Sequence, residues 1–222
     1  RDCLLSRGLG DVYKRQVKMW IEEFGIDGLR LDVAYCLDHN FMRRLRSFCE
    51  ELKPGFALIG EVLFGDYNLI VNDEMLHSCT NYECYKGIFS SFNCMNLFEI
   101  AHSLNRQFGP EQWCIYRGKH LMTFVDNHDV TRIASILTNK NHLPLAYGLL
   151  FGMPGIPCIY YGSEIEFQKG AVIDKGPNIA ISETGRAYFG DHIEGDVLTT
   201  DFAEYFGANG TTAETLSHPL AL

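Results

Sequence analysis

Residues 25–34 read GIDGLRLDVA, and this stretch decides the fold and the site that we predict. The run is typical of a short apolar strand, and side chains two positions apart in a strand point to the same side. Arg30 and Asp32 therefore share one face, and Asp32 stands where the apolar run stops. A buried carboxylate beside an arginine stays ionised, as a carboxylate nucleophile requires. For this stretch alone, a structural ion pair at a strand end is the alternative interpretation.

The rest of the chain alternates between helical and strand patterns, which predicts an α/β fold. Helices are expected over residues 17–24, 38–52, 97–108 and 142–152, and strands over 57–62, 121–125 and 156–161. Apolar residues in these strands do not alternate with polar ones, which is typical of parallel strands buried on both faces. Polar clusters follow the strands, where (β/α)8 barrels and open α/β sheets both place their sites. Residues 63–81 are expected to be a polar connection.

The two ends of the chain have a different character. Residues 1–16 have neither a helical nor a strand period, and we interpret them as a non-native tail that resembles translated adapter sequence. Residues 17–165 carry the α/β pattern. Residues 166–222 are acidic and rich in Gly, Thr and Asp, which predicts a loop-rich segment of open assignment at the end of the α/β domain.

Charge and cysteine content bear on partners and compartment. The net charge of −9, with no basic patch, argues against a nucleic-acid or anionic-membrane partner. No apolar run reaches the roughly 18 residues that a membrane span needs. The eight cysteines form no Cys-x-x-Cys pair and no Cys/His cluster with zinc spacing. We interpret them as reduced thiols, which favours a cytoplasmic protein, although an even count also fits disulfides.

Three carboxylates, Asp32, Glu61 and Asp129, each follow a predicted strand. Glycoside hydrolysis needs two carboxyl groups that flank the scissile bond, one ionised to attack the sugar and one protonated to release the leaving oxygen. Asp32 beside Arg30 suits the ionised role, and Glu61, with no cation near it in the sequence, suits the protonated role. Asp129 would support the positive charge of the transition state, with His128 bonding the same sugar.

Three motifs resemble those of a known family. GLRLDVA at residues 28–34, GEV at 60–62 and FVDNHD at 124–129 resemble, in order and separation, the second, third and fourth signature regions of the alpha-amylase family of glycoside hydrolases, family thirteen. The neopullulanase and cyclomaltodextrinase branch is the most similar. Residues 156–164 resemble the last barrel strand of that family. The resemblance implies a partial (β/α)8, or TIM, barrel with roughly strands 4 to 8, as an N-terminally truncated fragment that lacks the first signature region.

The resemblance also implies roles for the residues of these motifs. Asp32 would be the nucleophile that forms a covalent glycosyl-enzyme, and Arg30 would orient it. Glu61 would be the general acid and then the general base. Asp129 would stabilise the transition state, and His128 would bind the substrate.

Other positions are less specific. Tyr82 is expected to stack on the sugar, with packing in the core as the alternative. Arg132 either holds Asp129 or pairs elsewhere. Tyr35-Cys36 stands where many alpha-amylases have Lys-His, so calcium is left open, and no cofactor or metal is predicted.

The implied function is that of a retaining alpha-glycosidase acting on alpha-glucans such as maltooligosaccharides, cyclodextrins, pullulan or starch, although the fragment by itself is not expected to be fully active. A glucan transglycosylase of the same family would use the same residues. A non-catalytic glucan-binding or transporter-associated relative is a further alternative, against which the intact acids count. An unrelated metal-dependent barrel enzyme would need clustered His and carboxylate ligands. The expected partner is an oligo- or polysaccharide, with no nucleic acid and no membrane, and the full-length parent is expected to be a homodimer.

Overall fold

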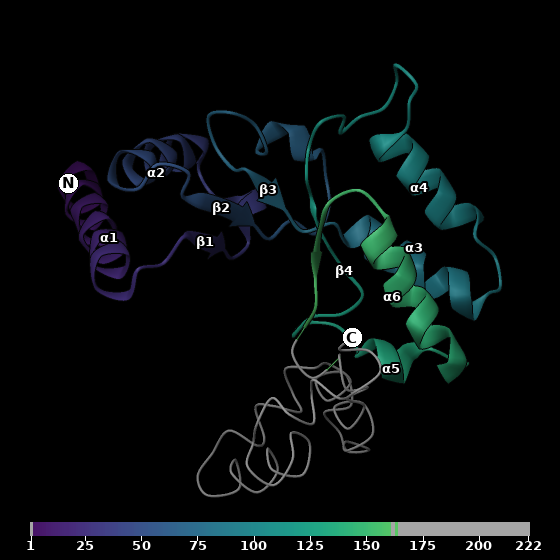
Figure 1. The fold of residues 1–222 in the computed structure, drawn as a ribbon. Helices are drawn as coiled ribbons and strands as arrows, with labels where there is room; N and C mark the ends of the chain where they lie inside the picture. The colour runs from purple at the N-terminus through teal and green to yellow at the C-terminus, as the bar shows by residue number, and fades with distance from the viewer. Residues whose placement is uncertain (1, 161–162, 164–222) are drawn as a thin grey trace, which may run out of the picture. The chain divides into compact units, whose positions relative to one another are not determined.

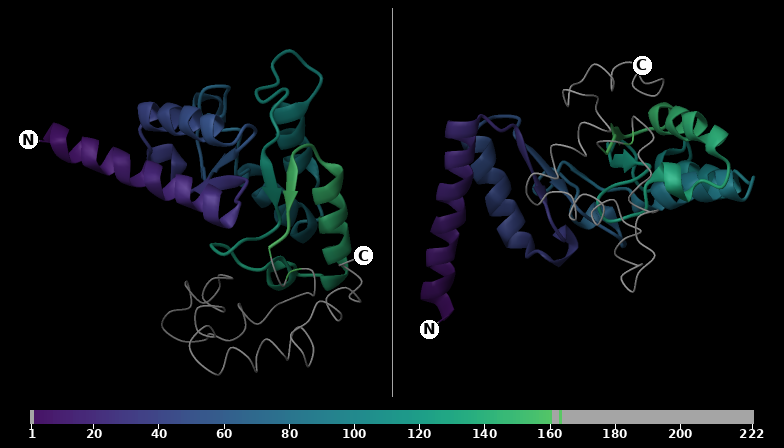
Figure 2. Two further views of the ribbon diagram at one scale, coloured as in Figure 1. Left: turned by 60° about the vertical axis from the view of Figure 1, so that its left-hand side comes forward. Right: turned by 90° about the horizontal axis from the view of Figure 1, so that it is seen from below.

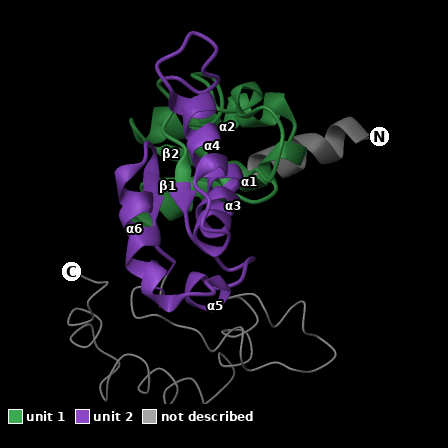
Figure 3. Cartoon of the chain, turned by 90° about the vertical axis from the view of Figure 1, so that its right-hand side faces the viewer, with its two compact units in different colours: residues 1–81, 118–122 green, residues 82–117, 123–222 purple. Residues whose placement is uncertain are grey.

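The computed structural model describes residues 2–160 and Ser163 and divides into two compact units (Figure 1). Unit 1 comprises residues 1–81 and 118–122, and unit 2 comprises residues 82–117 and 123–222 (Figure 3). Both units combine strands with helices, which confirms the predicted α/β class. The predicted segment over residues 166–222 lies outside the described residues.

Unit 1 is built on parallel strands in the order β1 (Gly28–Leu31), β2 (Ala57–Gly60) and β3 (Ser78–Cys79). The parallel strands that we predict within residues 25–34 and 57–62 are therefore confirmed. Strand β3 corrects our expectation of a connection without a strand over residues 63–81. Two residues are too few to produce a detectable period, and only pairing with β2 defines this strand.

Helix α2 (His39–Leu52) confirms the helix predicted over residues 38–52. The Asp38 carboxylate accepts a hydrogen bond from the Phe41 N–H at 2.8 Å and so satisfies one of the donors left open in the first turn. The buried side chains of α2 are Met42, Leu45 and Cys49, which lie on one face of the helix. This face packs in the core of unit 1.

Helix α1 (Asp2–Phe24) ends as predicted but begins earlier than we expect. Gly25 follows the last turn with φ +66°, a conformation that suits glycine as a C-cap. The absence of a period in residues 1–16 predicts no helix there, and this prediction is wrong. The Tyr13 ring contacts the Phe41 ring of α2, with centroids 5.1 Å apart, and α1 lies along α2 (Figure 2). Tertiary contact thus accompanies a helix that the sequence pattern does not indicate, and the non-native origin of these residues stays a prediction.

Unit 2 packs helices against a two-stranded sheet. Its described elements are α3 (Tyr82–Asn93), α4 (Phe98–Phe108), β4 (Met122–Phe124, which begins at the boundary with unit 1), α5 (Ile133–Ile136), α6 (Leu143–Gly152) and β5 (Ile156–Cys158). The core consists of buried apolar side chains from these helices and from the residue after β4, among them Ile88, Ile100, Val125, Ile133 and Leu150. The helices predicted over 97–108 and 142–152 and the strand predicted over 121–125 are confirmed. The strand predicted over 156–161 is confirmed only as far as Cys158, where β5 ends, and residue 161 lies outside the described residues.

Helix α3 has no counterpart among the predicted elements. Several of its buried positions are small residues, such as Gly87 and Ser91, which leave no clear apolar stripe in the sequence. A Cβ atom at Gly87 would lie 3.1 Å from the Ile100 side chain, so the small residue allows α4 to approach α3 closely. Small residues such as Gly87 therefore have two effects: they leave no apolar stripe in the sequence, and they allow α3 and α4 to pack closely. None of the helices in the described part of the chain is both long and apolar enough to cross a membrane.

Candidate active site

A single guanidinium joins the two carboxylates that follow β1 and β2. Arg30 Nη1 lies 2.5 Å from Asp32 Oδ1, and Arg30 Nη2 lies 2.8 Å from Glu61 Oε1. The strand register pairs Arg30 with Ile59, and side chains two positions apart share a face, so Glu61 emerges on the same side of the sheet as Arg30 and Asp32. Three of the residues predicted from the sequence thus form one hydrogen-bonded cluster in unit 1.

Backbone groups at the end of β1 and just after it bond both the main chain and the side chain of Glu61. Glu61 is 7% exposed, and its N–H donates to the Leu31 carbonyl at 2.8 Å. Its Oε2 accepts a hydrogen bond from the Val33 N–H at 3.1 Å. Val33 has φ 47° and ψ 43°, a left-handed conformation that costs a β-branched residue about 1–3 kcal/mol. Sequence reasoning misses Val33, because it continues an apolar run and carries no sign of its backbone conformation.

The surroundings of the two carboxylates differ from our expectation. The Asp32 side chain is 75% exposed rather than buried, because it lies in the turn just after the last residue of β1. The Glu61 side chain is 9% exposed and has Arg30 as a partner, although the sequence places no cation near it. The expectation of one paired and one unpaired carboxylate is therefore wrong. The two groups share their cation and differ in their exposure to solvent.

The remaining predicted site residues lie in unit 2. His128 Nε2 lies 3.0 Å from Asp129 Oδ2, and both side chains are about one third exposed. The Asn127 side chain accepts the Asp129 N–H at 2.8 Å and donates to the Tyr82 hydroxyl at 3.0 Å. The Tyr82 ring also packs against the Phe124 ring, with centroids 5.0 Å apart. Tyr82, His128 and Asp129 thus belong to one polar group around Asn127 in unit 2.

A buried polar network supports the loop that carries His128 and Asp129. Asp126, which is 1% exposed, accepts hydrogen bonds from the Ile133 N–H at 2.9 Å and the Ser163 hydroxyl at 2.7 Å. Arg132, which is fully buried, donates to the same hydroxyl at 2.9 Å. The Arg132 guanidinium also lies 4.2 Å from the centroid of the Tyr160 ring.

The described contacts of Arg132 run to Ser163 and Tyr160, and a role of Arg132 in holding Asp129 stays a prediction. In the sequence, Asp126 is distinguished only as part of the FVDNHD motif. The position of Asp126 at the end of an apolar strand could have indicated that its carboxylate is buried and hydrogen-bonded. Burial and the nearby Asp126 charge raise the pKa of the Cys158 thiol on β5.

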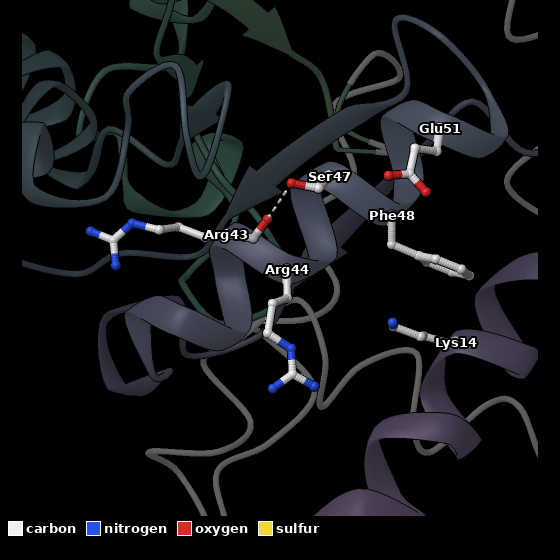
Figure 4. Close-up of a pocket in the computed structure, with 6 residues that line it drawn as sticks. All are labelled: Lys14, Arg43, Arg44, Ser47, Phe48 and Glu51. Atoms are coloured by element: carbon white, nitrogen blue, oxygen red, sulfur yellow. Dashed lines mark hydrogen bonds between the residues drawn. The ribbon is translucent and has the colours of Figure 1, made fainter.

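A hollow of about 270 Å³ lies between α1 and α2 and is separate from these groups. It is lined by Lys14, Arg43, Arg44, Ser47, Phe48 and Glu51 (Figure 4). The Arg43 guanidinium points away from Lys14 in this view, and Arg43 Nε bonds Glu74 at 2.8 Å. None of the lining residues is a predicted site residue. Over residues 2–160 and Ser163, no group of three or more His, Cys, Asp or Glu side chains could hold a metal ion.

The chain is similar in sequence to known proteins. The family model described as the alpha-amylase catalytic domain matches residues 9–186. The chain is 31% identical to an intracellular maltogenic amylase of Bacillus subtilis over 151 residues, which are 66% of this chain and 25% of that protein. It is 30% identical to a cyclomaltodextrinase of Geobacillus thermopakistaniensis over 162 residues, which are 68% of this chain and 26% of that protein. The chain therefore spans about a quarter of the length of these relatives.

A solved structure shows the same relationship at the level of the fold. The crystal structure of an Anoxybacillus alpha-amylase superposes with a TM-score of 0.63 and 24% sequence identity, over 88% of this chain and 43% of that one. The described units are thus part of an alpha-amylase TIM-barrel fold, and the predicted resemblance to the cyclomaltodextrinase branch is confirmed. Because the family match includes most of its residues, the chain belongs to the alpha-amylase family of glycoside hydrolases.

Proposed function

We propose that the chain supplies the reacting carboxyl groups of a retaining alpha-glycosidase that hydrolyses alpha-glucans through a covalent glycosyl-enzyme. The observation that carries this proposal is the Arg30 guanidinium bonded to both Asp32 and Glu61. A retaining glycosidase needs its two carboxyl groups only about 5–5.5 Å apart, so that one attacks the sugar while the other protonates the leaving group. Because both carboxylates bond the same guanidinium, they lie close to each other, and this closeness supports the proposed geometry.

In the first step, the exposed Asp32 is the attacking group. One of its carboxylate oxygens forms a bond to the anomeric carbon while the bond from that carbon to the leaving oxygen breaks. The leaving oxygen takes a proton from Glu61, whose position is restrained by the Val33 N–H and by Arg30. Arg30 keeps the Asp32 carboxylate oriented toward the sugar.

In the second step, water attacks the same carbon and gives a proton to Glu61, and Asp32 leaves as a carboxylate. Two displacements at one carbon return the original α configuration. Asp129 and His128 would bind the sugar and support the positive charge that develops in each transition state. Their convergence with Asp32 and Glu61 is part of the proposal, as is sugar contact by Tyr82.

The wider assignments are also proposals. We infer strands 4 to 8 of the barrel for the five strands described, because three signature motifs follow β1, β2 and β4 in family order. The names of the relatives, a maltogenic amylase and a cyclomaltodextrinase, support an alpha-glucan substrate, and the word intracellular in one of them supports a cytoplasmic location. A homodimeric parent protein stays a prediction.

The proposal is tested on the complete gene product that carries this sequence. The reaction of maltotriose followed by proton NMR should give the α-anomer first, before mutarotation. Asp32→Asn should lower kcat by more than about 10⁴-fold, and Glu61→Gln by about 10²–10⁴-fold. Initial release of the β-anomer, or turnover retained by Asp32→Asn, would contradict the mechanism. Transfer to added maltose in place of water would identify a transglycosylase with the same residues.

A further inference from the structure

Thr80 makes an unusual pair of contacts beside Glu61. Its Oγ1 accepts a hydrogen bond from the Val62 N–H at 2.8 Å and donates one to the Val62 carbonyl at 2.9 Å. A hydroxyl carries one donor and two acceptor positions, so it can satisfy both backbone groups of one residue at once. Thr80 is 3% exposed and Val62 is 2% exposed, so water does not replace these bonds at low cost.

The course of β3 explains why a side chain is needed at this point. The ladder between β2 and β3 ends at Gly60 and Cys79, and the Thr80 N–H still donates to the Gly60 carbonyl at 3.0 Å. The backbone then pairs with the next strand, because Thr80 forms a bridge with Met122. The Thr80 hydroxyl therefore takes the place of ladder hydrogen bonds at Val62, after the β2–β3 ladder has ended at Gly60.

Glu61 lies between the two residues that Thr80 contacts. Its own N–H and carbonyl are bonded toward β1, to the Leu31 carbonyl at 2.8 Å and the Ala34 N–H at 2.9 Å. On the β3 side, the ladder pairs Gly60 with Cys79, and Thr80 adds a bond to the Gly60 carbonyl and bonds to both backbone groups of Val62. Loss of the hydroxyl would leave two buried backbone groups unsatisfied next to Glu61 and would let this residue shift toward β1.

We propose that Thr80 is a positioning residue for Glu61, one that keeps its carboxyl group where it can protonate the leaving oxygen. This inference rests on the proposed function of Glu61 as the general acid. A group that must deliver a proton within hydrogen-bond reach is sensitive to small displacement, and a misplacement of about 1 Å can cost about 10²-fold in rate. Thr80 does not touch the substrate, so its effect should appear in catalysis rather than in substrate affinity.

The test compares two leaving groups in the complete gene product. Maltotriose needs protonation of its leaving sugar, whereas α-maltosyl fluoride releases fluoride with little need for an acid. Thr80→Val removes the hydroxyl at nearly constant shape, and Thr80→Ser keeps it. We expect Thr80→Val to lower kcat/KM for maltotriose by about 10–10²-fold and kcat/KM for the fluoride by less than about threefold. The comparison uses kcat/KM because this constant reports the first step, in which the leaving group departs, whereas kcat also includes the second step, in which Glu61 is the base for both substrates. Thr80→Ser should stay within about threefold of the parent protein on both substrates.

A matched control separates positioning from general stability. Ser91 is a buried residue in α3 whose hydroxyl donates to the Gly87 carbonyl. Ser91→Ala also removes a buried side-chain bond to the backbone, and it should change turnover of the two substrates by the same factor. If Thr80→Val does not fold, Thr80→Cys replaces it, since a thiol of similar size is only a weak donor and acceptor, and the same selective loss is expected.

Equal losses on maltotriose and the fluoride in the Thr80 variants, or no loss at all, would overturn the inference while leaving the proposed function intact. A parent protein that turns over neither substrate would instead contradict the proposed function itself. A selective loss of maltotriose turnover that Thr80→Ser restores would support both.

Discussion

Arg30 bonds Asp32 at 2.5 Å through Nη1 of its guanidinium and Glu61 at 2.8 Å through Nη2. The two carboxylates therefore depend on one cation for their orientation. Their exposure differs, because Asp32 lies in a turn open to solvent and Glu61 is buried against β1. This shared cation is the basis of the first prediction.

Arg30→Lys should lower kcat even though it keeps the charge. A lysine ammonium is a single point of contact and does not have the two fixed, planar nitrogens with which Arg30 bonds two different carboxylates. We expect a loss of about 10²-fold in kcat for maltotriose, the size of effect that a small misplacement of reacting groups produces. The matched control is Arg43→Lys, at a pair with Glu74 in which both side chains are exposed, where kcat should not change. Wild-type kcat in Arg30→Lys would show that the shared guanidinium is unimportant.

Val33→Gly should raise the free energy of unfolding. Val33 has φ 47°, where a β-branched side chain is disfavoured and glycine is not. Relief of this conformation should stabilise the protein by about 1 kcal/mol, measured by urea denaturation. Met95, with φ 51°, offers the same substitution far from the predicted acids in sequence, and Met95→Gly should stabilise similarly without changing kcat. A destabilised Val33→Gly protein would mean that the valine side chain contributes more than its backbone conformation costs.

Ser163→Ala should destabilise unit 2. The hydroxyl donates to buried Asp126 and accepts from buried Arg132, and hydrogen bonds to charged groups contribute about 1.5–3 kcal/mol each. We expect a loss of about 2–3 kcal/mol in the free energy of unfolding. Ser90→Ala removes an exposed hydroxyl bond to Glu99 and should cost less than about 1 kcal/mol. Similar losses in the two variants would argue against a special role for the network.

Stability should fall as the pH is lowered from 7.5 to 5.5, in part because of His77. Desolvation, followed by the nearby Arg46 charge, lowers the pKa of His77 below its ordinary value of 6.5. The unfolded chain therefore takes up a proton at a higher pH than the folded chain does, so this stabilisation is present above pH 6.5 and is lost as the pH falls through the folded pKa. The geometry agrees, because His77 Nδ1 accepts the Leu58 N–H at 3.0 Å and must be unprotonated to do so.

Urea midpoints at the two pH values measure this effect. His77→Gln removes the titration and should flatten the dependence over this range. The Glu99 carboxyl, whose pKa is lowered by its bonds to Lys86 and Ser90, titrates below this range and does not interfere. An unchanged slope in His77→Gln would assign the pH dependence to other groups.

The sequence was most informative where a pattern repeats over many residues. Helix α2 could be predicted together with its Asp38 cap, because three turns of apolar spacing follow a residue that favours N-caps. Strand β3 and helix α3 could not, since one is too short to have a period and the other buries small residues. The helix over residues 2–16 could not be predicted either, because these residues show no helical period. In the structure this part of α1 contacts α2 through the rings of Tyr13 and Phe41.

The site shows the same division between local and long-range information. The contact between Arg30 and Asp32 could be predicted, because it depends only on their spacing within one strand. The contact between Arg30 and Glu61 depends on the register of β1 against β2, which the local sequence does not specify. The support that Thr80 gives to Val62 depends in turn on where β3 ends, so it could be found only in three dimensions.

The identity of the nucleophile is the central claim, and covalent trapping tests it most directly. A 5-fluoro-α-glucosyl fluoride forms a glycosyl-enzyme that hydrolyses slowly, so peptide mass spectrometry of the complete gene product can locate the sugar. We predict a single label, on the Asp32 carboxylate, and no label in Asp32→Asn. A label on Glu61 or Asp129, or rapid turnover of maltotriose with no covalent label at Asp32, would contradict the account.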